Sequence, residues 1–175
     1  REEIRAAGGI CDLFKADVSD EAAMEAAVKK VRETMGPITL LVANAGTTRV
    51  RNHADLGVAE WRETMRVNLD GTFISVRAVK DAMLEAGGGA MVCLSSIAAL
   101  RPRAQQIDYA AAKAGVIAMV RCFAEALAPT VRVNAVAPGL TETDMIKEMD
   151  PAIFPGRIAA TPLGRLAKPE EAAET

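Results

Sequence analysis

The chain has 175 residues, of which 50% are hydrophobic and 25% charged, and its formal net charge is −2. This length suits one domain with a sizeable core. With no basic run and only 3% aromatic residues, the sequence offers no electrostatic or stacking surface for nucleic acid. The longest apolar runs are far below the roughly 20 residues of a membrane span, so no membrane partner is expected.

The cysteines and the histidine exclude further kinds of site. Cys11, Cys93 and Cys122 are widely spaced inside apolar runs, and no pair has zinc-ligand spacing. We interpret them as buried, reduced thiols of a cytoplasmic protein. His53 is the only histidine, which argues against a histidine-based triad and a multi-histidine metal site. No metal is therefore expected.

Taken in chain order, the sequence alternates strand-like and helical segments. It begins at Arg1 inside a helix-like run that Gly8 and Gly9 stop, which favours a fragment of a longer protein. Ser19 is expected to cap the first long helix. Apolar runs predict four strands, at residues 10–16, 38–42, 90–94 and 131–137. Helical spacing and stop signals predict helices at residues 22–35, 58–86, 109–127 and from about Pro169 onward.

This alternation predicts an α/β fold with a doubly wound parallel sheet and helices on both faces. Ligands of such sheets bind beyond the carboxyl ends of the strands. Small and polar residues occupy four of the expected strand ends, namely Asp17, Asn44-Ala45-Gly46, Ser95-Ser96 and Pro138-Gly139. The sequence therefore predicts a ligand site along one edge of the sheet.

Tyr109 and Lys113 are four residues apart, so a helix places both on one face. A phenol has an ordinary pKa of about 10, and a neighbouring ammonium lowers it. A serine hydroxyl at the preceding strand end could hold a carbonyl oxygen opposite the phenol, which gives a general acid/base. Two ordinary alternatives exist: a solvated helix face for the Tyr-Lys pair and simple turn chemistry for Ser95-Ser96.

Several ordered motifs span essentially the whole chain: Asp17-Val18, Asn44-Ala45-Gly46, Asn68, Ser96 thirteen residues before Tyr109, Lys113 four residues after it, Pro138-Gly139 with Thr143, Pro162-Leu163-Gly164-Arg165 and Pro169-Glu170-Glu171. As an ordered set they resemble the short-chain dehydrogenase/reductase family in its compact branch. The closest likeness is to 3-oxoacyl-[acyl-carrier-protein] reductases. The resemblance implies a Rossmann-like fold and an NAD(P)-dependent oxidoreductase that acts on a carbonyl or secondary alcohol.

The resemblance also implies catalytic roles. Tyr109 is the general acid/base, and Ser96 positions the substrate oxygen, with its neighbour Ser95 as the alternative. Lys113 lowers the pKa of the tyrosine and binds the nicotinamide ribose. Asn68 holds a water of the proton relay; a packed polar residue is the ordinary alternative. Gln106 is a candidate substrate contact.

The implied cofactor is NADP or NAD, with NADPH favoured by the resemblance alone. Asp17 would accept a hydrogen bond from the adenine amine, and Val18 would pack on the ring. Gly46 has no Cβ to block the approach of the cofactor. The remaining implied contacts are Asn44 and Ala45 along the cofactor and Pro138, Gly139, Leu140 and Thr143 around the nicotinamide, with Thr141 as the alternative to Thr143.

The chain departs from the family in lacking its glycine-rich first turn, which binds the pyrophosphate at a helix N-terminus. The first two strands and the last strand are missing as well, so residues 1–175 are expected to form a single partial domain. At about 4.8 Å per strand, the two absent strands leave a gap of roughly 14 Å between the first two expected strands. The exposed edge should make an isolated chain unstable or rearranged. Residues 140–162 are expected to form a substrate lid.

Two functional hypotheses follow. The first is the oxidoreductase, with a small carbonyl or alcohol substrate that is either free or acyl-carrier-bound. It would be a homodimer or homotetramer through helices 58–86 and 107–128, the usual interface of the family. The second is a truncated, non-catalytic fragment that acts, if folded, as a helix-mediated interaction module.

Overall fold

The computed structural model of the chain describes residues 1–147 and 151–175, and its centre is a three-stranded parallel sheet. The strands are β1 (Leu40–Ala43), β2 (Gly89–Leu94) and β3 (Val131–Val136), in the order β1-β2-β3. Leu40 pairs with Ala90 and Gly89 with Val131, so the carboxyl ends of all three strands meet at one edge. The α/β class, the parallel sheet and the partial Rossmann-like architecture are confirmed.

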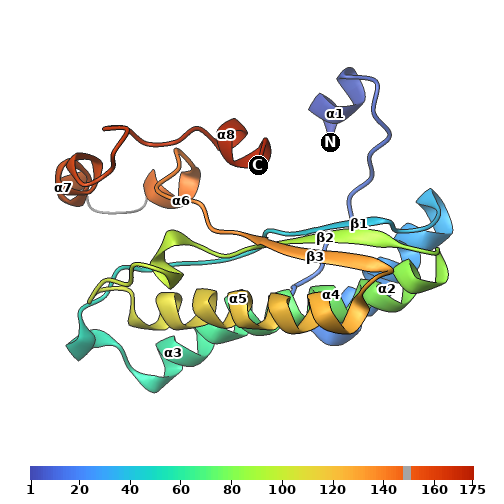
Figure 1. Cartoon of the computed structure of the whole chain (residues 1–175), viewed down its shortest axis with the longest axis horizontal. Helices are drawn as coiled ribbons and strands as arrows, with labels where there is room; N and C mark the ends of the chain where they lie inside the picture. The colour runs from blue at the N-terminus through green and yellow to red at the C-terminus, as the bar shows by residue number, and fades with distance from the viewer. Residues whose placement is uncertain (148–150) are drawn as a thin grey trace.

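Two long helices cover one face of this sheet, as Figure 1 shows. They are α4 (Gly71–Glu85) and α5 (Ile107–Leu127), and α2 (Glu21–Met35) packs on α4. The core lies between these helices and the sheet because their apolar faces meet there. Its buried residues are Ala43, Val76, Val79, Met83, Met91, Cys93, Val116, Val120, Val131 and Val133.

The other face of the sheet differs from the prediction of helices on both faces. Alternate residues of β1 point there, and Leu40 and Val42 are 74% and 65% exposed. The described helices with extensive contacts to the strands are α4 and α5, on the opposite face. Successive side chains of a strand point to opposite faces, so a single helical layer buries only every second residue of β1.

The prediction of a strand at residues 10–16 is wrong. This segment is extended but joins no sheet, and Ile10 and Leu13 are 90% and 67% exposed. A strand exists only through hydrogen bonds to a neighbour. The sheet described here ends at β1, so the apolar run has no strand beside it to pair with.

The helix expected at residues 58–86 is continuous but changes geometry in its middle. It consists of α3 (Val58–Met65), a π-helical turn (Arg66–Asp70) and α4. In the π turn, the N–H of Gly71 donates to the carbonyl of Arg66, five residues back. Such a turn inserts one extra residue and is frequent at functional sites. It contains Asn68.

The first long helix begins one residue later than the cap prediction implied. Asp20, not Ser19, is the N-cap of α2, because its carboxylate accepts from Ala23 N. The Ser19 hydroxyl instead donates to Asp17. The shorter elements are α1 (Glu2–Ala6), η1 (His53–Asp55), η3 (Ile97–Ala99), α6 (Asp144–Lys147), η4 (Pro151–Ile153), α7 (Phe154–Ala159) and α8 (Pro169–Ala173).

The expected lid, residues 140–162, falls partly outside the described residues. Its first residues are fixed to the C-terminal segment, since Ala167 N donates to Leu140 O and Glu142 N donates to Ala167 O. In Figure 1 the helices α6, α7 and α8 lie on the side of the sheet opposite α4 and α5.

The cysteines only partly match the prediction that all three are buried. Cys93 is buried in β2, Cys11 is half-buried and Cys122 is exposed on α5, and all three are free thiols. Among the described residues, no helix is both long and apolar enough to cross a membrane.

Candidate active site

The predicted catalytic residues lie where β2 and β3 end and α5 begins. Ser95 N donates to Val136 O at 2.8 Å, and Ile97 N donates to Pro138 O at 2.9 Å. These bonds hold the segment after β2 against the segment after β3. As expected for a parallel sheet, the small and polar residues of three strand ends share one edge.

Lys113 is the buried cation of this edge. Its ammonium donates to Leu94 O at 2.7 Å and lies 5.8 Å from the centre of the Tyr109 ring. Burial lowers the pKa of Lys113 from 10.5 to about 8. An ammonium has three donors, and this is the hydrogen bond found for it among the described residues, so two donors remain for other oxygens.

The two serines after β2 have different partners. The Ser95 hydroxyl donates to Lys113 O at 2.8 Å and is buried, which is a structural bond to α5. The Ser96 oxygen accepts from Ala98 N at 3.1 Å, and its hydroxyl acts on the Tyr109 phenol to lower the pKa of that group. Of the two hydroxyls, that of Ser95 is therefore occupied by a backbone carbonyl, whereas that of Ser96 has no such acceptor among the described residues.

The pKa of Tyr109 moves in the direction opposite to the one predicted. Burial of the phenol raises it, and the hydrogen bond with Ser96 opposes this without reversing it. The expected lowering by Lys113 is not found. The reason is that the ring is mostly removed from water, and desolvation disfavours the phenolate.

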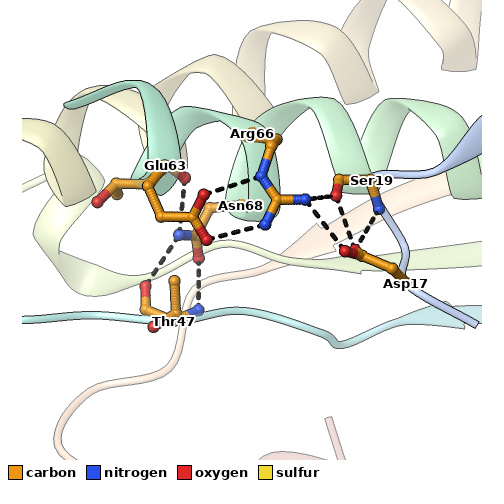
Figure 2. Close-up of polar contacts among 7 residues, drawn as sticks. Asp17, Ser19, Thr47, Glu63, Arg66 and Asn68 are labelled. Carbon is orange, nitrogen blue, oxygen red and sulfur yellow. Dashed lines mark hydrogen bonds and ion pairs between the residues drawn. The ribbon is translucent and has the colours of Figure 1, made fainter. Parts of the chain in front are cut away.

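Asn68 is fully buried, and its amide joins two segments (Figure 2). Its Nδ2 donates to Thr47 O at 2.9 Å and to Thr64 O at 3.0 Å, and its Oδ1 accepts from Thr47 N at 3.2 Å. The amide thus fixes the loop after β1 against the π turn. The two carbonyl oxygens can only accept, so the amide nitrogen must face them and the amide oxygen must face Thr47 N. This fixes the orientation of the Asn68 amide.

Gly46 explains how Asn68 and Lys113 approach each other. A Cβ at this position would lie 2.8 Å from Asn68 Oδ1 and 3.4 Å from Lys113 Nζ. The first distance is a clash, so a larger residue would displace the amide. The prediction gave Gly46 a role in admitting the cofactor; the structure adds that it makes room for two predicted catalytic side chains.

Asp17 lies in a second, more exposed network. Figure 2 shows Arg66 between Glu63 on one side and Asp17 with Ser19 on the other. Asp17 accepts from Ser19 N at 3.0 Å and from Arg66 Nη1 at 3.1 Å. These bonds, chiefly those from Ser19, lower the pKa of Asp17. The carboxylate is therefore ionised and already partly occupied by protein donors.

A shallow cavity of about 150 Å³ lies between Asp17's neighbour Val18 and the end of β1. Three of the residues predicted to contact a cofactor line it, namely Val18, Asn44 and Ala45. Gly71 backs the cavity, because a Cβ there would meet Val18 at 2.7 Å. A larger cavity of about 450 Å³, near Arg32 and Pro37, lies by the amino ends of the strands and holds no predicted site residue.

The other predicted contacts lie in the segment after β3, except for Gln106 at the start of α5. Gly139 has open space around its Cα, Leu140 is half-buried and Thr143 is exposed. The Thr141 hydroxyl donates to Gly139 O at 3.3 Å. Gln106, the N-cap of α5, is 7% exposed. The roles proposed for these residues stay predictions.

The sequence interpretation missed one buried charge. Asp108, directly before Tyr109, is 2% exposed and accepts from Thr64 Oγ1 at 2.6 Å and Arg51 Nη1 at 3.3 Å. An aspartate in the first turn of a helix was visible in the sequence. Its partners come from segments 44 and 57 residues away, which no local pattern indicates.

Fold and site together define a Rossmann-like α/β protein with a serine after β2, a tyrosine and a lysine on α5 and an asparagine in the π turn. The sequence profile of the short chain dehydrogenase family matches residues 1–153. The chain belongs to the short-chain dehydrogenase family.

Curated relatives agree with this family. A granaticin polyketide synthase protein of Streptomyces violaceoruber is 41% identical over 168 residues, which cover 91% of this chain and 66% of the relative. The 3-oxoacyl-[acyl-carrier-protein] reductase FabG of Thermotoga maritima is 36% identical over 167 residues, which cover 95% of this chain and 68% of that protein. An acetoacetyl-CoA reductase of Allochromatium vinosum is 36% identical over 174 residues, which cover 98% of this chain and 71% of that protein. The chain thus spans about two thirds of the length of these relatives.

Proposed function

We propose that the protein is an NAD(P)-dependent oxidoreductase in which Tyr109 is the general acid/base. The observation that carries this proposal is the buried ammonium of Lys113, which lies 5.8 Å from the centre of the Tyr109 ring. A solvated Tyr-Lys pair on a helix face would leave both groups in water. Here Lys113 is 4% exposed, so the ordinary alternative does not describe this pair.

The chain's own residues divide the work. The Ser96 hydroxyl orients the substrate oxygen next to the phenol, and Tyr109 gives or takes the proton at that oxygen. Lys113 turns its two remaining donors to the ribose hydroxyls of the cofactor. Asn68, fixed at Thr47 and Thr64, holds a water of the proton relay. When bound, the nicotinamide supplies or accepts the hydride.

The residues that are present fit a dinucleotide. The cavity beside Val18 is lined by apolar and small residues, among them Ala43 and Gly71, and the ionised carboxylate of the preceding residue, Asp17, suits the adenine amine. Asn44 and Ala45 line the same cavity at the end of β1. Pro138, Gly139, Leu140 and Thr143 frame the nicotinamide end. We favour NADPH over NADH on the resemblance to acyl-carrier-protein reductases.

The substrate class we propose is a 3-oxoacyl thioester, carried by an acyl carrier protein or coenzyme A. Its support is the naming of relatives as 3-oxoacyl-[acyl-carrier-protein] reductase and acetoacetyl-CoA reductase. Gln106 and the segment 140–162 would contact the acyl chain. We place the protein in the cytoplasm, where its three free thiols stay reduced.

The test is turnover of acetoacetyl-CoA with NADPH and with NADH, followed by loss of reduced-nicotinamide absorbance, for the wild type and Tyr109→Phe. The phenylalanine keeps the ring and removes the proton, so kcat should fall by about 10³-fold or more. Cofactor affinity, measured by fluorescence titration, should be unchanged. Activity that survives in Tyr109→Phe would reject the assignment.

The protein is also proposed to be a homodimer or homotetramer through residues 58–86 and 107–128. The outer faces of these helices support this. Phe73 is 43% exposed beside Phe123, with ring centres 6.1 Å apart. Along α5, Ala114, Ala118 and Ala126 are exposed, and small residues let helices approach closely. In sedimentation experiments the wild type should behave as an oligomer. The Phe73→Glu variant should give a smaller species, because the substitution places a charge in the proposed interface.

The same exposed helices favour one second candidate, a helix-mediated interaction module without catalysis. Fluorescence titration of the 175-residue chain with NADPH and NADH separates the two. Binding of either dinucleotide supports the enzyme. A folded, self-associating chain that binds neither supports the module.

A further inference from the structure

We propose that Asp108 is a positioning residue for proton transfer, because its carboxylate ties the start of α5, which carries Tyr109, to the turn that holds Asn68. This inference rests on the proposed function of Tyr109 and Asn68. It goes beyond that function by naming the group that fixes these two side chains relative to each other.

The first step is the position of Asp108 itself. Its Oδ1 accepts from Tyr109 N at 2.9 Å, where the helix has no side-chain cap at Gln106. The first N–H groups of a helix have no intrahelical partner, and a carboxylate there also suits the helix dipole. Asp108 therefore fixes the backbone of Tyr109 directly.

The second step leads from Asp108 to Asn68. The Thr64 hydroxyl donates to Asp108 Oδ2 at 2.6 Å, and the carbonyl of the same threonine accepts from Asn68 Nδ2 at 3.0 Å. Thr64 is 5% exposed. One buried residue of α3 thus connects the carboxylate before Tyr109 with the amide of Asn68.

The third step places Asn68 near the other end of the site. Asn68 and Lys113 both border Gly46, whose absent Cβ would lie 2.8 Å from Asn68 Oδ1 and 3.4 Å from Lys113 Nζ. Lys113 is one turn beyond Tyr109 on α5. The path from Tyr109 through Asp108 and Thr64 therefore fixes Asn68 on the side of Gly46 that faces Lys113, and a displacement of Thr64 or Asp108 shifts Asn68 relative to Tyr109.

Arg51 completes the anchor. Its Nη1 lies 3.3 Å from Asp108 Oδ2, and its backbone N donates to Gln105 O at 3.1 Å. The Arg51 side chain is 19% exposed and that of Asp108 is 3% exposed. The loop after β1 is therefore held at Thr47 by Asn68 and at Arg51 by Asp108, on both sides of the site.

This geometry predicts an effect on the chemical step rather than on binding. Displacement of reacting groups by about 1 Å can cost on the order of 10²-fold in rate. The contacts of Asp108 face α3 and the loop after β1, and none of them reaches the cavity beside Val18. Cofactor affinity should therefore not depend on them.

The experiment compares Thr64→Val, Thr64→Ser, Asp108→Asn and Tyr109→Phe in the protein, with acetoacetyl-CoA and NADPH. Valine keeps the shape of threonine and removes the hydroxyl, and serine keeps the hydroxyl. We expect kcat to fall about tenfold in Thr64→Val and about 100-fold in Asp108→Asn. The dissociation constant of NADPH should stay at the wild-type value, and Thr64→Ser should restore kcat.

Three outcomes overturn the proposal. These are wild-type kcat in Thr64→Val, equal losses in Thr64→Val and Thr64→Ser, and a parallel loss of NADPH binding. The Thr64 pair decides the matter even if Asp108→Asn does not fold. An inactive Tyr109→Phe together with a fully active Thr64→Val rejects the role of Asp108 alone. An active Tyr109→Phe rejects the proposed function, and the inference with it.

Discussion

Two polar networks meet at the π turn of residues 66–70, and they differ in burial rather than in chemistry. One runs from Arg51 through Asp108 and Thr64 to Asn68, and its central side chains are fully or almost fully buried. The other joins Arg66 to Asp17, Ser19 and Glu63 (Figure 2). In it, the side chains of Arg66, Asp17 and Glu63 are 43%, 55% and 58% exposed.

The comparison shows why similar contacts have different consequences. Water replaces a lost partner at the surface, and exposed ion pairs contribute little to stability. A buried donor or acceptor that loses its partner has no replacement and costs about 1–3 kcal/mol. The buried network therefore defines the geometry of the site, whereas the exposed one only holds the segment of Asp17 and Ser19 against Arg66. The following predictions test that difference.

The largest effect is expected from Asn68→Ala. It leaves the N–H and carbonyl of Thr47 and the carbonyl of Thr64 without their present partner. The free energy of unfolding should fall by about 3 kcal/mol or more, and turnover should be lost with it. Chemical denaturation measures the first quantity. Asn134→Ala, at an exposed position of β3, is the control, and an equal loss there would contradict the burial argument.

The pH dependence of stability should reveal Lys113. Burial lowers its pKa from 10.5 to about 8, so between these pH values the unfolded chain binds more protons than the folded one. Stability should therefore rise with pH across this window, by about 3 kcal/mol in total, and Lys113→Met should abolish the rise. Below pH 8 the cost of the buried charge is present in full.

The measurement is best made in a Cys93→Ala background. Burial raises the pKa of the Cys93 thiol from 9.0 to about 11, so its titration lowers stability over an overlapping range. Denaturation curves at several pH values then isolate the lysine. A flat profile between pH 8 and 10.5 in that background would contradict a buried Lys113.

Gly46→Ala should have a smaller effect on stability, of about 1–3 kcal/mol, because its Cβ would overlap Asn68 Oδ1. Turnover should fall more than cofactor affinity, since the amide moves. Thermal unfolding and steady-state kinetics measure the two. Gly156→Ala, where a Cβ meets no atom within 4 Å, is the matched control. If both variants behave alike, the contact of Gly46 with Asn68 is unimportant.

The smallest effect is expected from Arg66→Ala. It removes the ion pairs to Glu63 and Asp17, but all these groups remain in contact with water. The midpoint of thermal unfolding should change little at low salt and not at all at high salt. A loss that matches that of Asn68→Ala would show that exposure does not separate the two networks.

Reading the sequence alone was enough to predict the α/β class, the three strands that form, the long helices and the order of the site residues along one edge. These features depend on apolar periodicity, on stop signals and on motifs within a few residues, such as Tyr109 and Lys113 one helical turn apart. The choice of Ser96 over Ser95 stays a prediction, although the Ser95 hydroxyl is already engaged by Lys113 O.

The remaining features depend on which segments the fold brings together. Residues 10–16 have a strand-like sequence, yet a strand needs a neighbour, and the described sheet ends at β1. The raised pKa of Tyr109 follows from burial, which is set by segments far away in the chain. The partners of Asp108 come from α3 and the loop after β1. Local patterns report the preferences of a segment, whereas desolvation and long-range hydrogen bonds depend on what the fold places beside it.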